Sequence, residues 1–171
     1  MRSAEAGDVL RARARVLAKP RIEAGDGIAV DGIDALVVVV EQQRFAIPLE
    51  RIAAIARAST IVPLPRAVAP VYGVIAWRGR TLTVLTLAGV APELRDDSRF
   101  VVLGDARRVE LAILVDAVED AVRIPFTSIT RTDGSSRHAQ ASGVTNDAML
   151  VLDVDALIRG RRNETTATPM A

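Results

Sequence analysis

The chain contains a single histidine, His138, which is the first residue to consider for chemistry. It follows Ser135, Ser136 and Arg137 in a polar stretch, and the chain has no cysteine. One imidazole cannot by itself supply the ligands that a zinc site needs. A Ser-His-Asp triad would use residue types that are plentiful here, but the sequence has no G-x-S-x-G elbow to hold the serine. We therefore expect His138 to lie in a solvent-exposed loop.

Acidic residues also occur close together, and carboxylates that converge in a cleft can bind metal ions or hydrolyse glycosides. The groups are Asp96-Asp97, Asp116, Glu119-Asp120, and Asp153 with Asp155. Basic neighbours such as Arg95 and Arg99 lie among them. Solvated turns and helix caps are therefore their expected roles, and we predict no metal site.

A phosphate-binding loop of the form G-x-x-x-x-G-K-[ST] is absent from the sequence. The fragment Gly25-Asp26-Gly27 is not followed by a predicted helix, so it indicates a turn. With no nucleophile, ligand cluster or cofactor-binding motif, the sequence predicts a binding protein without catalytic residues or a cofactor.

Composition and charge exclude further classes of protein. The 171 residues favour one domain with tails, and half of them are apolar, which allows a sizeable core. With 22 basic and 21 acidic residues the net charge is +1. The chain thus lacks the clustered basic excess typical of nucleic-acid binding. The absence of cysteine rules out disulfides and thiolate metal sites.

The sequence predicts a cytoplasmic protein. Residues 1–20 interleave arginine and alanine and contain no apolar stretch of the length that a signal peptide requires. The longest apolar run, Ala35 to Val40, is far too short to span a bilayer. We expect no direct insertion into a membrane.

Three segments are expected along the chain: a basic helix and linker over residues 1–34, a domain over 35–160, and a disordered tail over 161–171. The helix is predicted over residues 8–19, between a possible N-cap at Asp8 and the helix-breaking Pro20. It could pack on the domain or fray in solvent, or it could dock on a partner. Binding to a membrane surface is poorly supported, because its apolar face is narrow and rich in alanine.

Short aliphatic runs separated by turn residues predict strands through the domain. The predicted strands are Ala35–Val40, Phe45–Leu49, Val71–Trp77, Thr81–Leu87, Phe100–Leu103, Val109–Val115 and Met149–Leu152. Arg78-Gly79-Arg80 predicts a hairpin turn in which Gly79 takes a positive φ. Residues 132–143 are expected to form a polar loop, and Asp153 or Asp155 to cap a short closing helix through Arg159.

The two halves of the domain share a weak repeat of strand, polar turn, strand, short apolar segment and aliphatic-proline. The aliphatic-proline pairs that we match are Leu64-Pro65 and Ile124-Pro125. No long amphipathic helix separates the strands, which disfavours a parallel α/β sheet. The sequence therefore predicts an all-β fold with two similar small barrels.

Several segments resemble the CheW-like domain family, in order and over about residues 35–159. Val71–Leu87 reads V-Y-G-V-I-A-W-R-G-R-T-L-T-V-L-T-L and is similar to the family pattern V-x-G-V-I-N-L-R-G-x-[IV]-x-P-V-[IV]-D-L. Phe45–Ile55 resembles Y-G-I-x-[IL]-x-x-V-x-E-I, and Leu64-Pro65 takes the place of the I-P that follows it. Ala112–Val118 resembles G-L-[VL]-V-D-x-V, and Met149–Asp155 resembles the closing segment.

The resemblance implies two intertwined SH3-like five-stranded β-barrels with a groove between them, a short N-terminal helix and a short C-terminal helix. It also implies a non-catalytic adaptor in chemotaxis that can be recruited to membrane-associated receptor arrays. The partners implied are the regulatory domain of a CheA-type histidine kinase and the cytoplasmic helical tip of a chemoreceptor. The protein-binding residues implied are Ile52, Ala54, Ile55, Gly73, Trp77, Arg78 and Gly79.

Four positions depart from the family pattern. Ala76 and Trp77 stand where the pattern has Asn and Leu, Ala54 replaces an acidic residue, and Thr86 replaces Asp. Trp77 could cover the core or anchor an interface. The departures at Ala54, Ala76 and Thr86, together with the added basic helix over residues 8–19, leave an alternative open, in which the chain is a divergent CheW-like regulator of surface sensing, gliding or cyclic-dinucleotide signalling.

Overall fold

The structure is a computed structural model that describes residues 31–65, 67, 69–87, 94–104, 108–132 and 140–166, the last six by their backbone alone. All of these residues belong to one compact unit, which begins at Asp31. The expected helix over residues 8–19, the turn at residues 25–27, His138 and the end of the tail lie outside the described residues.

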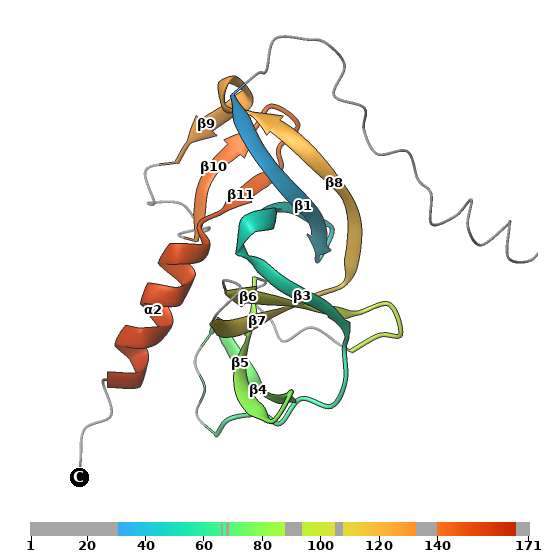
Figure 1. Ribbon diagram of the computed structural model, residues 1–171, viewed down its shortest axis with the longest axis vertical. Coiled ribbons are helices and arrows are strands. Elements are labelled where there is room, and N and C mark those ends of the chain that lie inside the picture. Colours follow the sequence, from blue (N-terminus) through green and yellow to red (C-terminus); the bar gives the residue numbers. More distant parts are fainter. Residues whose placement is uncertain are drawn as a thin grey trace, which may run out of the picture. The chain divides into compact units, whose positions relative to one another are not determined.

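Both ends of the described chain contribute to a six-stranded sheet, here called sheet A (Figure 1). Its order is β8-β1-β2-β11-β10-β9. The strands are β1 (Gly32–Val40), β2 (Gln43–Pro48), β8 (Ala117–Pro125), β9 (Ile129–Arg131), β10 (Ala141–Thr145) and β11 (Leu150–Leu152). Strands β2 and β11 run parallel, with Phe45 opposite Leu150. The last strand of the chain, β11, thus lies between β2 and β10.

The middle of the chain forms a five-stranded sheet, here called sheet B, with the order β3-β6-β7-β5-β4. Its strands are β3 (Ile52–Arg57), β4 (Val71–Trp77), β5 (Arg80–Thr86), β6 (Arg99–Gly104) and β7 (Val109–Val115). The chain leaves sheet A after β2, completes sheet B, and returns to sheet A through β8. This path confirms the expected all-β, two-part intertwined fold, with one strand more in sheet A than the five expected.

Three clusters of buried side chains stabilise the two sheets. The largest cluster takes residues from both sheets and from the closing helix, among them Leu36 of β1, Leu85 of β5, Leu152 of β11 and Leu157. A second cluster lies within sheet B and includes Ile75, Leu82 and Phe100. The third lies within sheet A and consists of Ala35, Val37, Ala46, Ile124, Met149 and Val151. Alternate residues of β1 therefore face different clusters, as the two-residue period of a strand requires.

The closing helix, α2 (Val154–Thr166), begins as expected from the sequence but ends later. The Asp153 carboxylate accepts a hydrogen bond of 2.8 Å from the backbone N–H of Ala156, which is the bond of an N-cap residue. The helix continues seven residues past Arg159, into the segment expected to be a disordered tail. No proline lies between residues 160 and 166, so nothing there forces the helix to end.

The two halves of the domain correspond at a different pair of prolines from the pair predicted. Pro48 ends β2 and precedes the 3-10 turn η1 (Leu49–Arg51), and Pro125 ends β8 and precedes the 3-10 turn η2 (Phe126–Ser128). The structural partner of Ile124-Pro125 is therefore Ile47-Pro48. Leu64-Pro65 is exposed and lies outside the strands, so the predicted pairing was wrong.

Candidate protein-interaction site

The tip of the β4–β5 hairpin carries three of the predicted site residues. Trp77 pairs with Arg80 across the hairpin, which leaves Arg78 and Gly79 as the two turn residues. Their φ angles are +46° and +77°. Positive φ at both central positions is the mark of a type I′ turn, which follows the natural twist of the strands. The predicted turn and the positive φ of Gly79 are confirmed.

The guanidinium of Arg78 lies over the ring of Trp77, with its central carbon 5.3 Å from the ring centroid. Trp77 is half-buried and packs against the sheet-B cluster. The ring thus joins an exposed cation to the core and restricts its position. Of the two roles that the sequence left open for Trp77, covering the core is the one that these contacts show, and anchoring an interface stays a prediction.

Gly73 is buried in β4 and serves close packing. A Cβ atom at this position would lie 2.5 Å from the backbone oxygen of Val62. Val62 forms two backbone hydrogen bonds with Val74, of 2.8 and 2.9 Å. Because the chain at Val62 runs directly beside β4, only glycine fits without displacing backbone. Any role of Gly73 in binding would be indirect.

The other predicted site residues lie on β3, at the opposite end of the sheet-B order from β4. Ile52 and Ala54 are half-buried and pack against core clusters, whereas Ile55 points outward and is 47% exposed. Ala54 and Trp77 pack against the same sheet-B cluster. The structure therefore divides the seven residues into a hairpin group and a β3 group, in which Ile55, Arg78 and Gly79 are exposed.

The departures from the family pattern differ in their exposure. Ala76 is exposed on β4, next to the hairpin tip. Thr86 is only 4% exposed, and its backbone N–H donates a 2.9 Å hydrogen bond to the oxygen of Pro70. Ala54 packs inward. Of these three replacements, only the one at Ala76 changes a side chain that a partner could reach directly.

Leu49 and Phe126 are two of the exposed apolar residues that lie outside the predicted set. Their side chains are 40% and 55% exposed, and each is the first residue of a 3-10 turn after a proline. The sequence signal was the repeated aliphatic-Pro-apolar triplet at residues 47–49 and 124–126. Because Ile124-Pro125 was matched with Leu64-Pro65 instead of Ile47-Pro48, this repeat was not found from the sequence.

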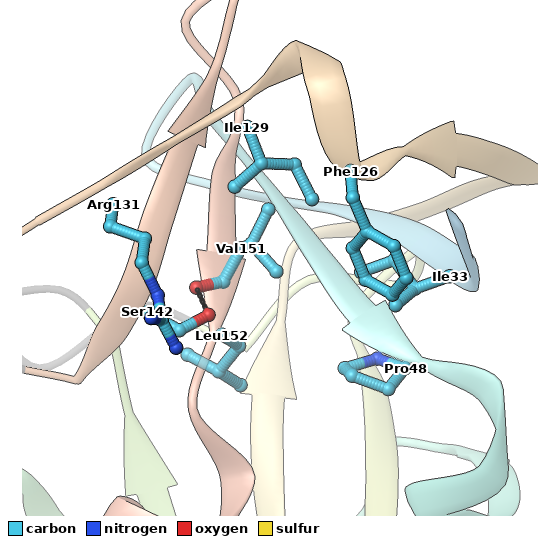
Figure 2. Close-up of a pocket in the computed structure, with 8 residues that line it drawn as sticks. All are labelled: Ile33, Pro48, Phe126, Ile129, Arg131, Ser142, Val151 and Leu152. Atoms are coloured by element: carbon cyan, nitrogen blue, oxygen red, sulfur yellow. Dashed lines mark hydrogen bonds between the residues drawn. The ribbon is translucent and has the colours of Figure 1, made fainter. Parts of the chain in front are cut away.

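A pocket of about 430 Å³ opens beside Phe126 (Figure 2). Eight residues line it: Ile33, Pro48, Phe126, Ile129, Arg131, Ser142, Val151 and Leu152. A second pocket of about 440 Å³ shares Ile33, Pro48 and Phe126 and adds Asp34, Leu49 and Glu50. The two pockets thus form adjoining hollows around the start of β1.

Charged side chains of β2, β8 and the β10–β11 turn form a surface network. Arg44 pairs with Glu119 at 3.0 Å and with Asp147 at 3.4 Å. A hydrogen bond from the Thr145 hydroxyl, helped by nearby Arg44, lowers the pKa of the Asp147 carboxyl. Asp96-Asp97 lies in a turn and Asp153 caps α2, as expected, whereas Glu119-Asp120 lies in strand β8 instead of a turn. No three His, Asp or Glu side chains of the described residues are grouped to hold a metal ion.

Comparisons with known proteins agree on one family. The family model of the CheW-like domain matches residues 34–162. The chain is 28% identical over 136 residues to the chemotaxis protein CheW of Thermotoga maritima, covering 76% of this chain and 90% of the relative. The scaffolding protein TtCheW of Thermoanaerobacter tengcongensis has a similar fold, with a TM-score of 0.60 at 16% identity over 71% of this chain and 89% of that one.

These findings decide two general questions about the chain. The matched family is one of non-catalytic scaffolds, so the prediction that this protein is not an enzyme is confirmed. In the part of the chain that the structure describes, no helix has the length and apolar character to cross a membrane. From residue 34 to residue 162, the chain belongs to the CheW-like domain family.

Proposed function

We propose that this scaffold couples the cytoplasmic helical tip of a chemoreceptor to the regulatory domain of a CheA-type histidine kinase. The observation that carries the proposal is the Arg78 guanidinium, held over Trp77 at the tip of an exposed hairpin and supported by a family match over residues 34–162. A positioned cation beside an aromatic ring is the composition typical of an interface hot spot.

The hairpin is the proposed contact for the kinase. Strand β4 is the last strand of sheet B, and beyond it only the short bridge at Val62 pairs with it among the described residues. The strand edge from Ala76 to Trp77 could therefore pair with backbone of another protein. Arg78 would then reach a carboxylate or carbonyl of that partner.

The receptor is proposed to contact the exposed apolar residues Ile55 and Leu49. An amphipathic helix offers apolar side chains to a surface of this kind. The half-buried neighbours Ile52 and Ala54 support that surface from below, because both pack against the core.

A divergent role in a non-chemotaxis circuit is the alternative. Of the three replacements that support this alternative, only the one at Ala76 changes an exposed side chain, because Thr86 is buried and Ala54 faces the core. The predicted basic helix over residues 8–19, which also supports it, lies outside the described residues. Chromosomal neighbours would separate the two: a motility operon favours coupling in chemotaxis, and a lone diguanylate cyclase or response-regulator cluster favours the alternative.

The variant Arg78→Asn tests the hairpin contact. Asparagine tolerates positive φ better than arginine, and Asn-Gly is the preferred pair of a type I′ turn. The variant should melt at or above the wild-type temperature. Its affinity for the kinase regulatory domain should nevertheless fall by roughly 1–2 kcal/mol, or about 5–30-fold, in titration calorimetry.

Arg80→Asn is the matched control, since Arg80 is an exposed arginine beside the same turn. It should bind within about twofold of wild type, as exposed substitutions outside a contact usually do. If a folded Arg78→Asn variant binds the kinase normally, Arg78 is not part of the kinase contact. No binding of the wild-type chain to any CheA-type kinase or receptor of its organism would count against the whole proposal.

A further inference from the structure

The pocket beside Phe126 extends into the core of sheet A. Val151 and Leu152 of β11 line it, although their side chains are only 4% and 2% exposed. Ile33 and Ile129, on its sides, pack against the same buried cluster as Val151. The floor of the pocket is therefore formed by residues of the sheet-A core.

The lining is apolar except at one end. In Figure 2 the ring of Phe126 lies with Ile33 on one side, Val151 occupies the middle, and Arg131 lies with Ser142 on the other side. The Ser142 hydroxyl donates its hydrogen to the oxygen of Val151 at 3.2 Å. Arg131 forms no ion pair with any other described residue, and its guanidinium offers hydrogen-bond donors only.

The adjoining pocket has the opposite charge. It contains Asp34 and Glu50, both exposed. Asp34 is paired with Arg123, at 3.0 Å from each carboxylate oxygen, so that carboxylate is largely neutralised. Glu50 makes no ion pair with another described side chain. A ligand that spans the shared apolar residues Ile33 and Phe126 would therefore meet a positive charge at one end and a negative charge at the other.

We propose that the pocket binds a small amphiphile with one carboxylate head group, its apolar body lying between Phe126 and Val151 and its carboxylate meeting Arg131. A pocket of about 430 Å³, mostly apolar with a few polar groups at one end, has the size and composition of a small-molecule site. A guanidinium can hold a carboxylate by two parallel hydrogen bonds. Repulsion by Glu50 favours the orientation with the head group at Arg131.

Two amphiphiles of equal chain length test the charge preference directly. Decanoate and decyltrimethylammonium, each kept below its micelle concentration, are titrated into the full-length protein while amide NMR shifts are followed. We expect saturable shifts in η2, β9 and β11, and about fivefold tighter binding of decanoate, the size expected of one partly exposed ion pair. Phe126→Ala should weaken the binding of both.

Three arginine variants isolate the role of the head group. Arg131→Gln should bring the two affinities within twofold of each other, and Arg131→Lys should retain a preference for decanoate. Arg57→Gln is the matched control, because Arg57 is an exposed arginine of sheet B. It should leave the preference unchanged.

Three results would overturn the proposal: shifts that do not saturate, equal affinities of the wild-type protein for the two amphiphiles, or an unchanged preference in Arg131→Gln. If the Arg131→Gln variant fails to fold, the Arg131→Lys variant provides the test. Loss of the preference for decanoate in Arg131→Lys would then count against the site. The proposal is independent of the kinase contact, since Arg78→Asn should bind decanoate as the wild type does.

Discussion

Four described residues other than glycine have positive φ, and all lie in tight turns: Glu41, Gln42, Arg78 and Ala148. At two of the turns, side-chain bonds support the backbone. The N–H of Glu41 donates to the Asp116 carboxylate at 2.7 Å, and the Thr145 hydroxyl accepts a bond from the N–H of Met149 beside Ala148. At Arg78 the described support is the stacking on Trp77. Backbone strain at Arg78 thus coincides with an exposed, positioned cation, which is the pattern expected of a functional residue.

Gly73→Ala is predicted to destabilise the fold. The added methyl group would lie 2.5 Å from the Val62 oxygen, which is held by hydrogen bonds to Val74. Overpacking of this kind costs about 1–3 kcal/mol, and urea unfolding would measure it. Ala76→Val, an exposed change in the same strand, should stay within about 0.5 kcal/mol of wild type. Weakened kinase binding by Gly73→Ala under conditions where it is fully folded would contradict a purely structural role for Gly73.

Two exposed glycines, Gly79 and Gly160, both have room for a side chain but differ in backbone conformation. A Cβ atom on Gly79 or Gly160 would meet no heavy atom within 4 Å. Gly79 has a φ of +77° in the hairpin turn, whereas Gly160 lies within α2. Any difference between alanine variants at the two positions must therefore come from the backbone.

Gly79→Ala should lower the free energy of unfolding by about 1 kcal/mol, because alanine is strained at positive φ. Gly160→Ala should raise it by about 0.5–1 kcal/mol, because alanine favours the helix. Thermal melts of both variants would show shifts of opposite sign. Shifts of the same sign would mean that one of the two elements, the type I′ turn or the helix at residue 160, is wrongly assigned.

Elements bounded by clear turn signals could be predicted from the sequence. The bounds of β4 and β7 coincide with the predicted Val71–Trp77 and Val109–Val115. In contrast, β9 has three residues, and β10 begins inside the predicted polar loop. They pair with each other and with β11, and this group joins the rest of sheet A through the pairing of β11 with β2, which is distant in sequence. Local propensity could not reveal strands that depend on such pairing.

The candidate site could be predicted only in part, because exposure depends on how the whole chain is wrapped. The turn at Gly79 follows from local chemistry. That Gly73 and Thr86 are buried while Ile55 is exposed depends on the path of the chain past Val62 and on the order of strands in sheet B. The pocket likewise needs residues from η2, β1, β9 and β11, which no local pattern connects.

At the scale of the molecule, the shared core predicts that the two sheets unfold together. Leu152 of sheet A and Leu85 of sheet B belong to the same buried cluster, whereas the only tryptophan, Trp77, lies in sheet B. Trp77 fluorescence therefore reports on sheet B alone, while far-ultraviolet circular dichroism reports on both sheets. Trp77 fluorescence can therefore show whether a substitution in the sheet-A part of the core also destabilises sheet B.

Leu152→Ala should lower the stability by about 2–5 kcal/mol, the usual cost of truncating a buried leucine. If the shared cluster makes the unfolding cooperative, the midpoint of Trp77 fluorescence should fall by the same amount as the midpoint of circular dichroism. Leu64→Ala provides the matched control, because Leu64 is 40% exposed and its truncation should cost within about 0.5 kcal/mol. A Leu152→Ala variant that keeps the wild-type midpoint of Trp77 fluorescence while circular dichroism shows early loss of strands would mean that sheet B is stable without sheet A. Each sheet would then be an independent folding unit despite the path of the chain between them.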